Sequence, residues 1–119
     1  MITGMHLTLF CSDSDAAGLR SFLRDTLKVK SFDAGGGWLI FQLPGEIAAH
    51  PDDETAEGEA ATPDLGSACD DLKKTVADLK KVGVKFVIDI TDEGWGLRAR
   101  FQMPAGLEAD LYEPRYKPK

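Results

Sequence analysis

The 119-residue sequence has few cysteines, no stripe of basic side chains and no long apolar run. Two cysteines are too few for a disulfide framework and too sparse for a cysteine-based zinc site. Because phosphate contacts dominate nucleic-acid binding, the lack of a basic stripe predicts no nucleic-acid partner. The apolar runs fall well short of the ~20 residues that a membrane span needs, which predicts no membrane partner. The opening residues, MITGMHLTLF, lack the basic flank of a signal peptide, so we expect a cytoplasmic location.

The acidic residues are unevenly distributed. The formal net charge is −6, from 20 acidic and 14 basic residues. Six of the acids lie in residues 51–64, which contain no Lys or Arg, so the rest of the chain is formally neutral. This run lacks the alternating Asp/Asn spacing and the closing Glu of a calcium loop. We interpret it as a solvated linker.

The segments on either side of this linker show the same order of predicted elements. Each begins with a short strand, continues with an amphipathic helix and ends with three strands separated by Gly or Pro turns. The first half has a strand at 5–11, a helix at about 14–27 capped by Ser12 or Ser14, and strands at 29–33, 38–43 and 46–50. The second has a strand at 65–69, a helix capped by Asp70 or Asp71 and ending at Val82-Gly83, and strands at 84–90, 97–103 and 107–113.

Local sequence echoes support a duplication. Phe41-Gln-Leu-Pro44 and Phe101-Gln-Met-Pro104 match at an offset of 60, and Trp38 and Trp95 each follow a glycine turn. The same order of matches between matching element patterns indicates an internal repeat of two β-α-β-β-β units.

Five segments carry a resemblance to a known family. They are His6-Leu-Thr-Leu-Phe-Cys-Ser-Asp13, Phe22-Leu-Arg-Asp-Thr-Leu27, Gly94-Trp-Gly96, Pro104-Ala-Gly106 and Asp110-Leu-Tyr-Glu-Pro114. Over roughly residues 2–115 the chain resembles the vicinal oxygen chelate superfamily, which includes glyoxalase I, bleomycin-resistance proteins and extradiol dioxygenases. The resemblance implies an α+β fold in one domain, 1–119, with module 1 at about 2–50, the acidic linker at 51–64 and module 2 at about 65–115. The two βαβββ modules would form an open cup of curved mixed sheets.

The same resemblance implies where metal ligands would lie, because family members hold a divalent metal on the first and last strands of each module. His6 and Asp110 match two of these positions, a third falls at Pro63 or Asp64, and a fourth falls near Ala48. His50 lies two residues beyond Ala48 and therefore on the same strand face. Glu113 has the opposite parity to Asp110 and enters the cup only through a bulge.

The implied metal set is therefore His6, His50 and a carboxylate from Asp110 or Glu113, which suits Fe, Zn, Mn or Ni. Other interpretations remain open for three of these residues. His6 can instead line a polar pocket or be an ordinary partly buried histidine. His50 can be a surface residue, and Asp110 can be a structural carboxylate.

Several further residues are candidates for substrate binding. Four aromatic residues fit the core or the cup wall, with stacking on a cofactor as the alternative. Two arginines alternate on one strand, where they face an anionic substrate group or pair with surface acids. With Tyr112 of the last strand, the predicted substrate-binding set is Trp38, Phe41, Trp95, Arg98, Arg100, Phe101 and Tyr112. No arrangement in the sequence supports nucleophilic catalysis, and the catalytic residues remain unknown.

Two functions remain open. The first is a metal-dependent lyase, isomerase or dioxygenase that acts on a small molecule with vicinal oxygens. The second is a protein of the bleomycin-resistance type that binds an aromatic or cationic compound without any cofactor. The resemblance also implies a homodimer, because family members often cover their sheet edges and apolar faces by pairing.

Overall fold

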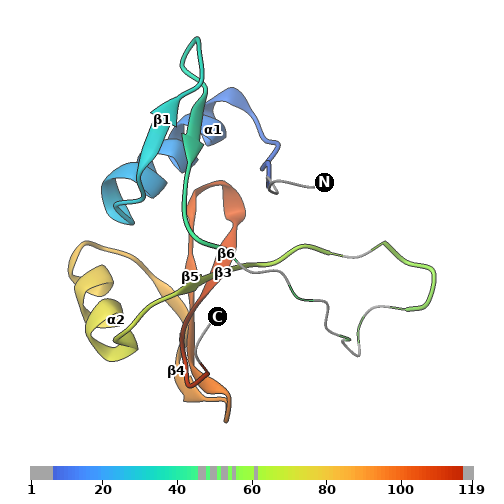
Figure 1. Ribbon diagram of the computed structural model, residues 1–119, viewed down its shortest axis with the longest axis vertical. Coiled ribbons are helices and arrows are strands. Elements are labelled where there is room, and N and C mark those ends of the chain that lie inside the picture. The colour runs from blue at the N-terminus through green and yellow to red at the C-terminus, as the bar shows by residue number, and fades with distance from the viewer. Residues whose placement is uncertain are drawn as a thin grey trace.

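The computed structural model describes residues 7–45, 48, 51, 54, 56–60 and 62–116 (Figure 1). The elements run in the order α1 (Asp13–Ser21), a π-helical turn η1 (Phe22–Thr26), β1 (Ser31–Asp33), β2 (Leu39–Phe41), β3 (Leu65–Ala68), α2 (Leu72–Lys81), β4 (Phe86–Asp92), β5 (Gly96–Gln102), a 3₁₀ turn η2 (Pro104–Gly106) and β6 (Glu108–Pro114). Within the described residues, no helix has the length and apolar character needed to cross a membrane.

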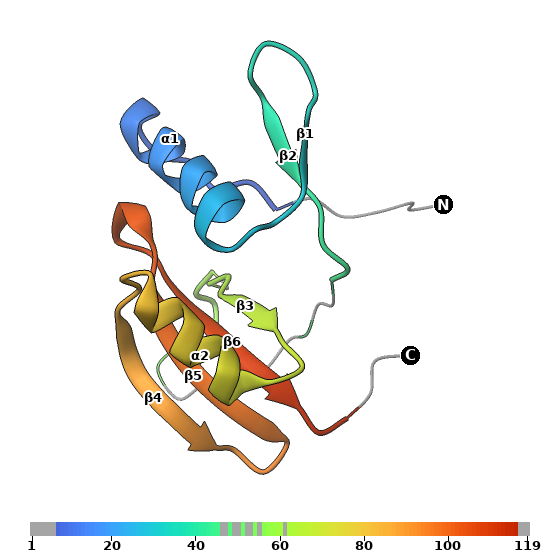
Figure 2. The same ribbon diagram turned by 90° about the vertical axis from the view of Figure 1, so that its left-hand side faces the viewer.

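The second half of the chain forms a four-stranded mixed sheet covered by one helix. Its strand order is β3-β6-β5-β4, with β3 parallel to β6 and the other pairs antiparallel. Helix α2 lies across one face of this sheet and leaves the other face uncovered by a helix of this half (Figure 2). The predicted order of strand, helix and three strands is confirmed here.

Helix α2 begins and ends where the sequence indicates. The Asp71 side chain accepts a hydrogen bond from the Lys74 backbone N–H at 3.1 Å, so one of the two predicted caps is the actual one. Beyond the last turn, Gly83 adopts a φ of +92°, which a residue with a side chain rarely tolerates. Leu72, Val76 and Leu79 lie on the buried face of the helix.

The first half contains the predicted helix and a short hairpin. Helix α1 is capped by Ser12, whose Oγ accepts from the Asp15 N–H at 3.2 Å, and η1 extends it close to the predicted end. Strands β1 and β2 pair only over residues 31–33 and 39–41, and form a separate two-stranded sheet. The hairpin stands apart from the four-stranded sheet (Figures 1 and 2).

The prediction of a first strand at 5–11 is wrong for its described part. Residues 7–11, its described part, form no strand. Alternating side chains give a segment the correct period, but a strand also needs a neighbour for its backbone hydrogen bonds. Phe10 in this segment is 93% exposed. The predicted strand at 46–50 lies outside the described residues except for Ala48, which is not in a strand.

The first helix packs against the core of the second half. Phe101 of β5 is fully buried between α2 and α1–η1, and its ring lies 6.4 Å from Phe22 and 5.8 Å from Phe86. Leu19 of α1 belongs to the same buried cluster. The first helix is thus held to the second half by apolar packing, close to the η2 turn between β5 and β6 (Figure 2).

Candidate functional site

Five of the eleven predicted site residues lie on or beside the face of the four-stranded sheet that points away from α2. Alternate residues of β5 and β6 point to opposite faces, so Ala99, Phe101, Ala109 and Leu111 pack under α2 while their neighbours point away from it. The strand register places Arg98 opposite Tyr112 and Arg100 opposite Asp110. We call this surface the polar face; it comprises Asp64, Arg98, Arg100, Glu108, Asp110 and Tyr112.

Arg100 lies at the centre of the polar face. Its Nη1 donates to Asp110 Oδ1 at 2.8 Å and to Asp64 Oδ2 at 3.2 Å, and its Nη2 donates to Asp64 Oδ1 at 3.1 Å. Its Nε donates to Glu108 Oε1 at 3.0 Å. The hydrogen bonds that Arg100 donates to Asp64, and then the one it donates to Asp110, raise the pKa of the guanidinium above its ordinary, already high value. Arg100 is therefore a permanent cation among three carboxylates.

Arg98 adds a second cation on the same face. Its Nη2 lies 3.1 Å from Asp110 Oδ1, and its Nη1 lies 3.8 Å from Glu93 Oε1. Both guanidiniums therefore meet at a single oxygen of Asp110. Counting Glu93, the face carries four carboxylates against two guanidiniums, and this excess makes it locally acidic.

An aromatic pair borders the ionic network. The rings of Trp95 and Tyr112 meet edge to face with their centroids 5.7 Å apart. Trp95 lies in the turn before β5 and is 45% exposed. Gly66 of β3 leaves room for Tyr112, because a Cβ at this position would lie 3.2 Å from the Tyr112 Cε1 atom. The polar face thus combines an exposed aromatic surface with a fixed array of charges.

Known structures of the same architecture were found for almost the whole chain. An antibiotic binding protein from Streptomyces sp. CB03234, TnmS3, is 22% identical with a TM-score of 0.63, over 96% of this chain and 99% of that one. A glyoxalase/bleomycin resistance protein/dioxygenase superfamily member from Sphaerobacter thermophilus DSM 20745 is 20% identical with a TM-score of 0.62, over 94% and 98%. The chain has the glyoxalase/bleomycin resistance/dioxygenase fold. The predicted α+β class, with mixed sheets that do not close into a barrel, is confirmed.

Enzymes share this fold. A lactoylglutathione lyase from Agrobacterium tumefaciens is 12% identical with a TM-score of 0.57, over 82% of this chain and 84% of that one. No family model and no curated protein matches the sequence. At such identities the glyoxalase/bleomycin resistance/dioxygenase likeness establishes the fold, and any activity must be argued from the site.

The two predicted metal ligands that lie within the described residues, Asp110 and Glu113, do not come together. Asp110 lies on the polar face, but β5 and β6 pair without a register shift, so Glu113 points to the opposite face. There its Oε1 accepts from the Leu72 N–H at 2.9 Å, at the start of α2. His6 and His50 lie outside the described residues.

A divalent metal does not fit the polar face as the described residues form it. Asp110 is already shared by two guanidiniums, and a dication beside them would be repelled. In the described part of the chain, no three His, Cys, Asp or Glu side chains are arranged to hold a metal ion. The ion pairs therefore engage Asp110, one of the residues that the resemblance implies as a metal ligand.

The predicted substrate residues separate into three groups. Trp95, Arg98, Arg100 and Tyr112 lie together at the polar face. The prediction that Phe101 binds substrate is wrong, because its side chain points to the opposite face of the strand and is buried in the core under α2. Trp38 and Phe41 lie on the β1–β2 hairpin, away from the four-stranded sheet. Asp64 and Glu108 were not predicted as site residues. Two features of the sequence could have identified them. Glu108 alternates with Asp110 and so shares its strand face, and Asp64 matches a ligand position of the family.

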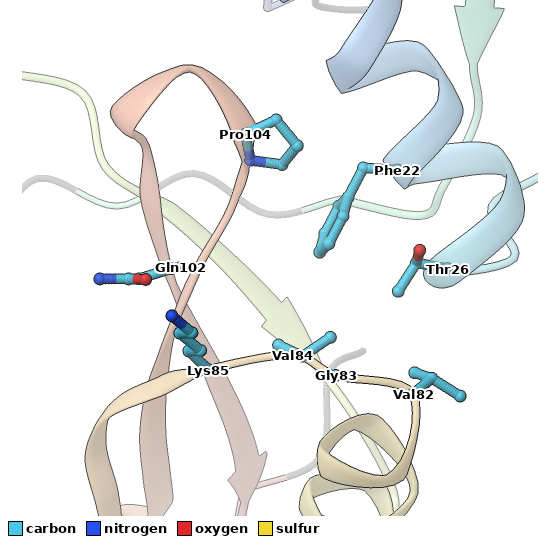
Figure 3. Close-up of a pocket in the computed structure, with 8 residues that line it drawn as sticks. All are labelled: Phe22, Thr26, Val82, Gly83, Val84, Lys85, Gln102 and Pro104. Carbon is cyan, nitrogen blue, oxygen red and sulfur yellow. The ribbon is translucent and has the colours of Figure 1, made fainter.

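A cavity of about 400 Å³ lies elsewhere, between η1 and the α2–β4 connection (Figure 3). Phe22 and Thr26 border it on one side, with Val84 and Pro104 among the residues opposite. Of the residues that line it, all within the described chain, only Lys85 carries a charge, and none was predicted as a site residue. The lining mixes polar and apolar side chains but brings no group of charges together, so the polar face is the better candidate site.

Proposed function

We propose that the protein binds a small organic molecule at the polar face without a metal ion. The observation that carries this proposal is the double engagement of Asp110 by Arg98 and Arg100. A carboxylate that neutralises two guanidiniums is a poor ligand for a dication, whereas the same ion pairs form a rigid, preorganised surface. The likeness to an antibiotic binding protein supports a binding role.

The chemistry of the face favours a flat aromatic ligand with a positive charge. Trp95 and Tyr112 provide ring edges and faces for stacking and for cation–π contact. The excess of carboxylates over guanidiniums lowers the energy of a cation nearby and raises that of an anion.

A fluorescence titration with ethidium, a planar aromatic cation, tests this proposal. We expect saturable binding that EDTA does not change, and weaker binding of the aromatic anion 8-anilinonaphthalene-1-sulfonate. Replacing Tyr112 with alanine should weaken ethidium binding about tenfold, in line with the ~1.4 kcal/mol upper range of an aromatic contact.

The hairpin supplies a matched control for this titration. Trp38→Ala removes a tryptophan that is also half-exposed, at 58%, but lies away from the polar face, and it should leave the affinity unchanged. Stoichiometric metal that is lost in His6→Ala, or ethidium binding abolished by EDTA, would overturn the proposal in favour of the metal-dependent enzyme.

We further propose that the chain forms a homodimer. The first half exposes large apolar side chains, among them Leu7, Phe10, Trp38 and Leu43, and residues 7–11 have the alternation of a strand without forming one. Exposed apolar surface of this kind is typical of interfaces, and a second copy provides a strand neighbour.

Light scattering coupled to size-exclusion chromatography checks the assembly. We expect a particle of twice the 12.9 kDa chain mass, and a shift toward the monomer when Phe10 is replaced by lysine, because a buried ammonium without a partner is costly. A stable 12.9 kDa particle at high concentration would contradict the dimer.

A further inference from the structure

The turn that carries Trp95 is held by Arg115, the first residue after β6 and not a member of the polar face. The Arg115 guanidinium donates two parallel hydrogen bonds to the Asp92 carboxylate, from Nη1 to Oδ1 and from Nη2 to Oδ2, both 2.7 Å long. Its Nη1 also donates to the Gly94 carbonyl oxygen at 2.8 Å. The Arg115 side chain therefore joins the end of β4 to the turn that leads into β5.

The backbone of the turn is fixed at the same place. The Arg115 backbone N–H donates to the Trp95 carbonyl oxygen at 2.9 Å, and Asp92 Oδ1 accepts from the Gly94 N–H at 2.9 Å. The hydrogen bonds that Arg115 donates, and next the one from the Gly94 N–H, lower the pKa of Asp92, so this carboxylate is charged at neutral pH. Trp95 thus follows a residue whose N–H and carbonyl oxygen are both hydrogen-bonded, and its own carbonyl oxygen is hydrogen-bonded as well.

The pair of Arg115 and Asp92 is suited to fixing a position and not to stabilising the fold. The two side chains are 50% and 60% exposed, and exposed ion pairs contribute little to the free energy of unfolding. Two parallel hydrogen bonds between a guanidinium and a carboxylate nevertheless permit only one relative orientation of the two groups. Loss of the pair should therefore change the position of the turn more than the stability of the protein.

We propose that Arg115 is a positioning residue for ligand binding, because it holds the turn that places the Trp95 ring against Tyr112 at the border of the polar face. The Trp95 ring is 45% exposed, so little packing holds it and its place depends on the backbone of the turn. The inference rests on the function proposed above and assigns part of the affinity to a residue that does not touch the ligand.

Ethidium titration and acrylamide quenching of fluorescence test the proposal in a Trp38→Phe background, where Trp95 is the remaining tryptophan. Arg115→Met keeps the aliphatic stem and removes the guanidinium. We expect the Kd for ethidium to rise about fivefold and the Trp95 quenching constant to rise about twofold. The melting temperature should stay within about 3 °C of the parent. Arg115→Gln is the second variant if the methionine variant does not fold.

Electrostatics alone predicts the opposite sign for this substitution, because removing a cation favours a cationic ligand. Arg115→Lys keeps the charge but cannot form the paired hydrogen bonds, and it should weaken ethidium binding nearly as much as Arg115→Met. Asp92→Asn should weaken binding as well, and combining it with Arg115→Met should add little, since both remove the same pair.

Arg24→Met is the matched control. Arg24 also donates two hydrogen bonds to a carboxylate, that of Asp25 at 2.8 and 3.1 Å, and its side chain is also 50% exposed, but this pair lies in η1. The substitution should change neither the ethidium affinity nor the quenching of Trp95.

The outcomes distinguish this inference from the proposed function. If folded Arg115→Met binds ethidium as tightly as its parent or more tightly, or if Arg24→Met loses as much affinity, the role of Arg115 is refuted while ethidium binding by the wild type stands. If the wild type binds no ethidium, the proposed function fails, and the role of Arg115 in placing Trp95 is then refuted by an unchanged quenching constant and supported by a raised one.

Discussion

Replacing Phe101 with alanine is expected to lower the free energy of unfolding by about 4 kcal/mol, the largest effect of a single substitution that we predict. Phe101 is fully buried, and its ring touches the rings of Phe22 and Phe86 under α2. Truncation removes apolar contact on all sides and leaves a cavity that the sheet cannot fill. Because Phe22 belongs to the first half, the loss also weakens the attachment of α1.

Urea unfolding at one fixed protein concentration measures this effect, since a dimer would make the midpoint concentration-dependent. Phe101→Leu is the graded control, and its smaller volume change should cost about 1–2 kcal/mol. A loss below ~1 kcal/mol for Phe101→Ala would contradict the central place of this ring in the core.

Replacing Gly96 with alanine is expected to destabilise the protein by about 3 kcal/mol. A Cβ at this position would lie against the backbone carbonyl oxygen of Glu113, closer than Cβ atoms are found to other atoms, and near Pro114 Cα. The neighbour is backbone and cannot rotate away, so β5 and β6 must separate at their paired ends. The hydrogen bond from the Arg115 N–H to the Trp95 carbonyl oxygen, 2.9 Å long, would be strained as well.

Gly18 provides a control with the opposite sign. It lies inside α1, and a Cβ there would meet Pro104 at an ordinary contact distance of 3.7 Å. Gly18→Ala should therefore stabilise the protein by about 0.5–1 kcal/mol through helix propensity. Thermal unfolding of the two variants beside the wild type checks both directions. An unchanged melting temperature in Gly96→Ala would show that the strand ends relax at little cost.

The helix and strands of the second half could be predicted in detail because the sequence signals for each of them lie within the element itself. Asp71 and Gly83 mark the ends of α2, and alternating apolar residues mark β5 and β6, so each element follows from the residues within it. The first half was less predictable. Its helix carries the same local information, whereas its first strand depends on a neighbour that no residue in 7–11 specifies.

The candidate site likewise combines features that follow from local sequence with features that depend on distant residues. Strand alternation placed Arg98 and Arg100 on one face, and the resemblance made Asp110 a candidate at the last strand. The same parity rule should have excluded Phe101, because it lies one residue from Arg100 on the same strand. The partners of these side chains did not follow from parity, since Asp64 and Arg100 are 36 residues apart.

The order of residues by itself determined the element order of the second half, the ends of α2 and the set of side chains on each strand face, because these depend on short-range periodicity and capping. Only the tertiary structure decided that Asp110 faces two guanidiniums, that Glu113 accepts a hydrogen bond from the first residue of α2 and that the ring of Trp95 contacts that of Tyr112. Those contacts join segments distant in the chain, and charge and shape select among such partners only once the sheet has brought them together.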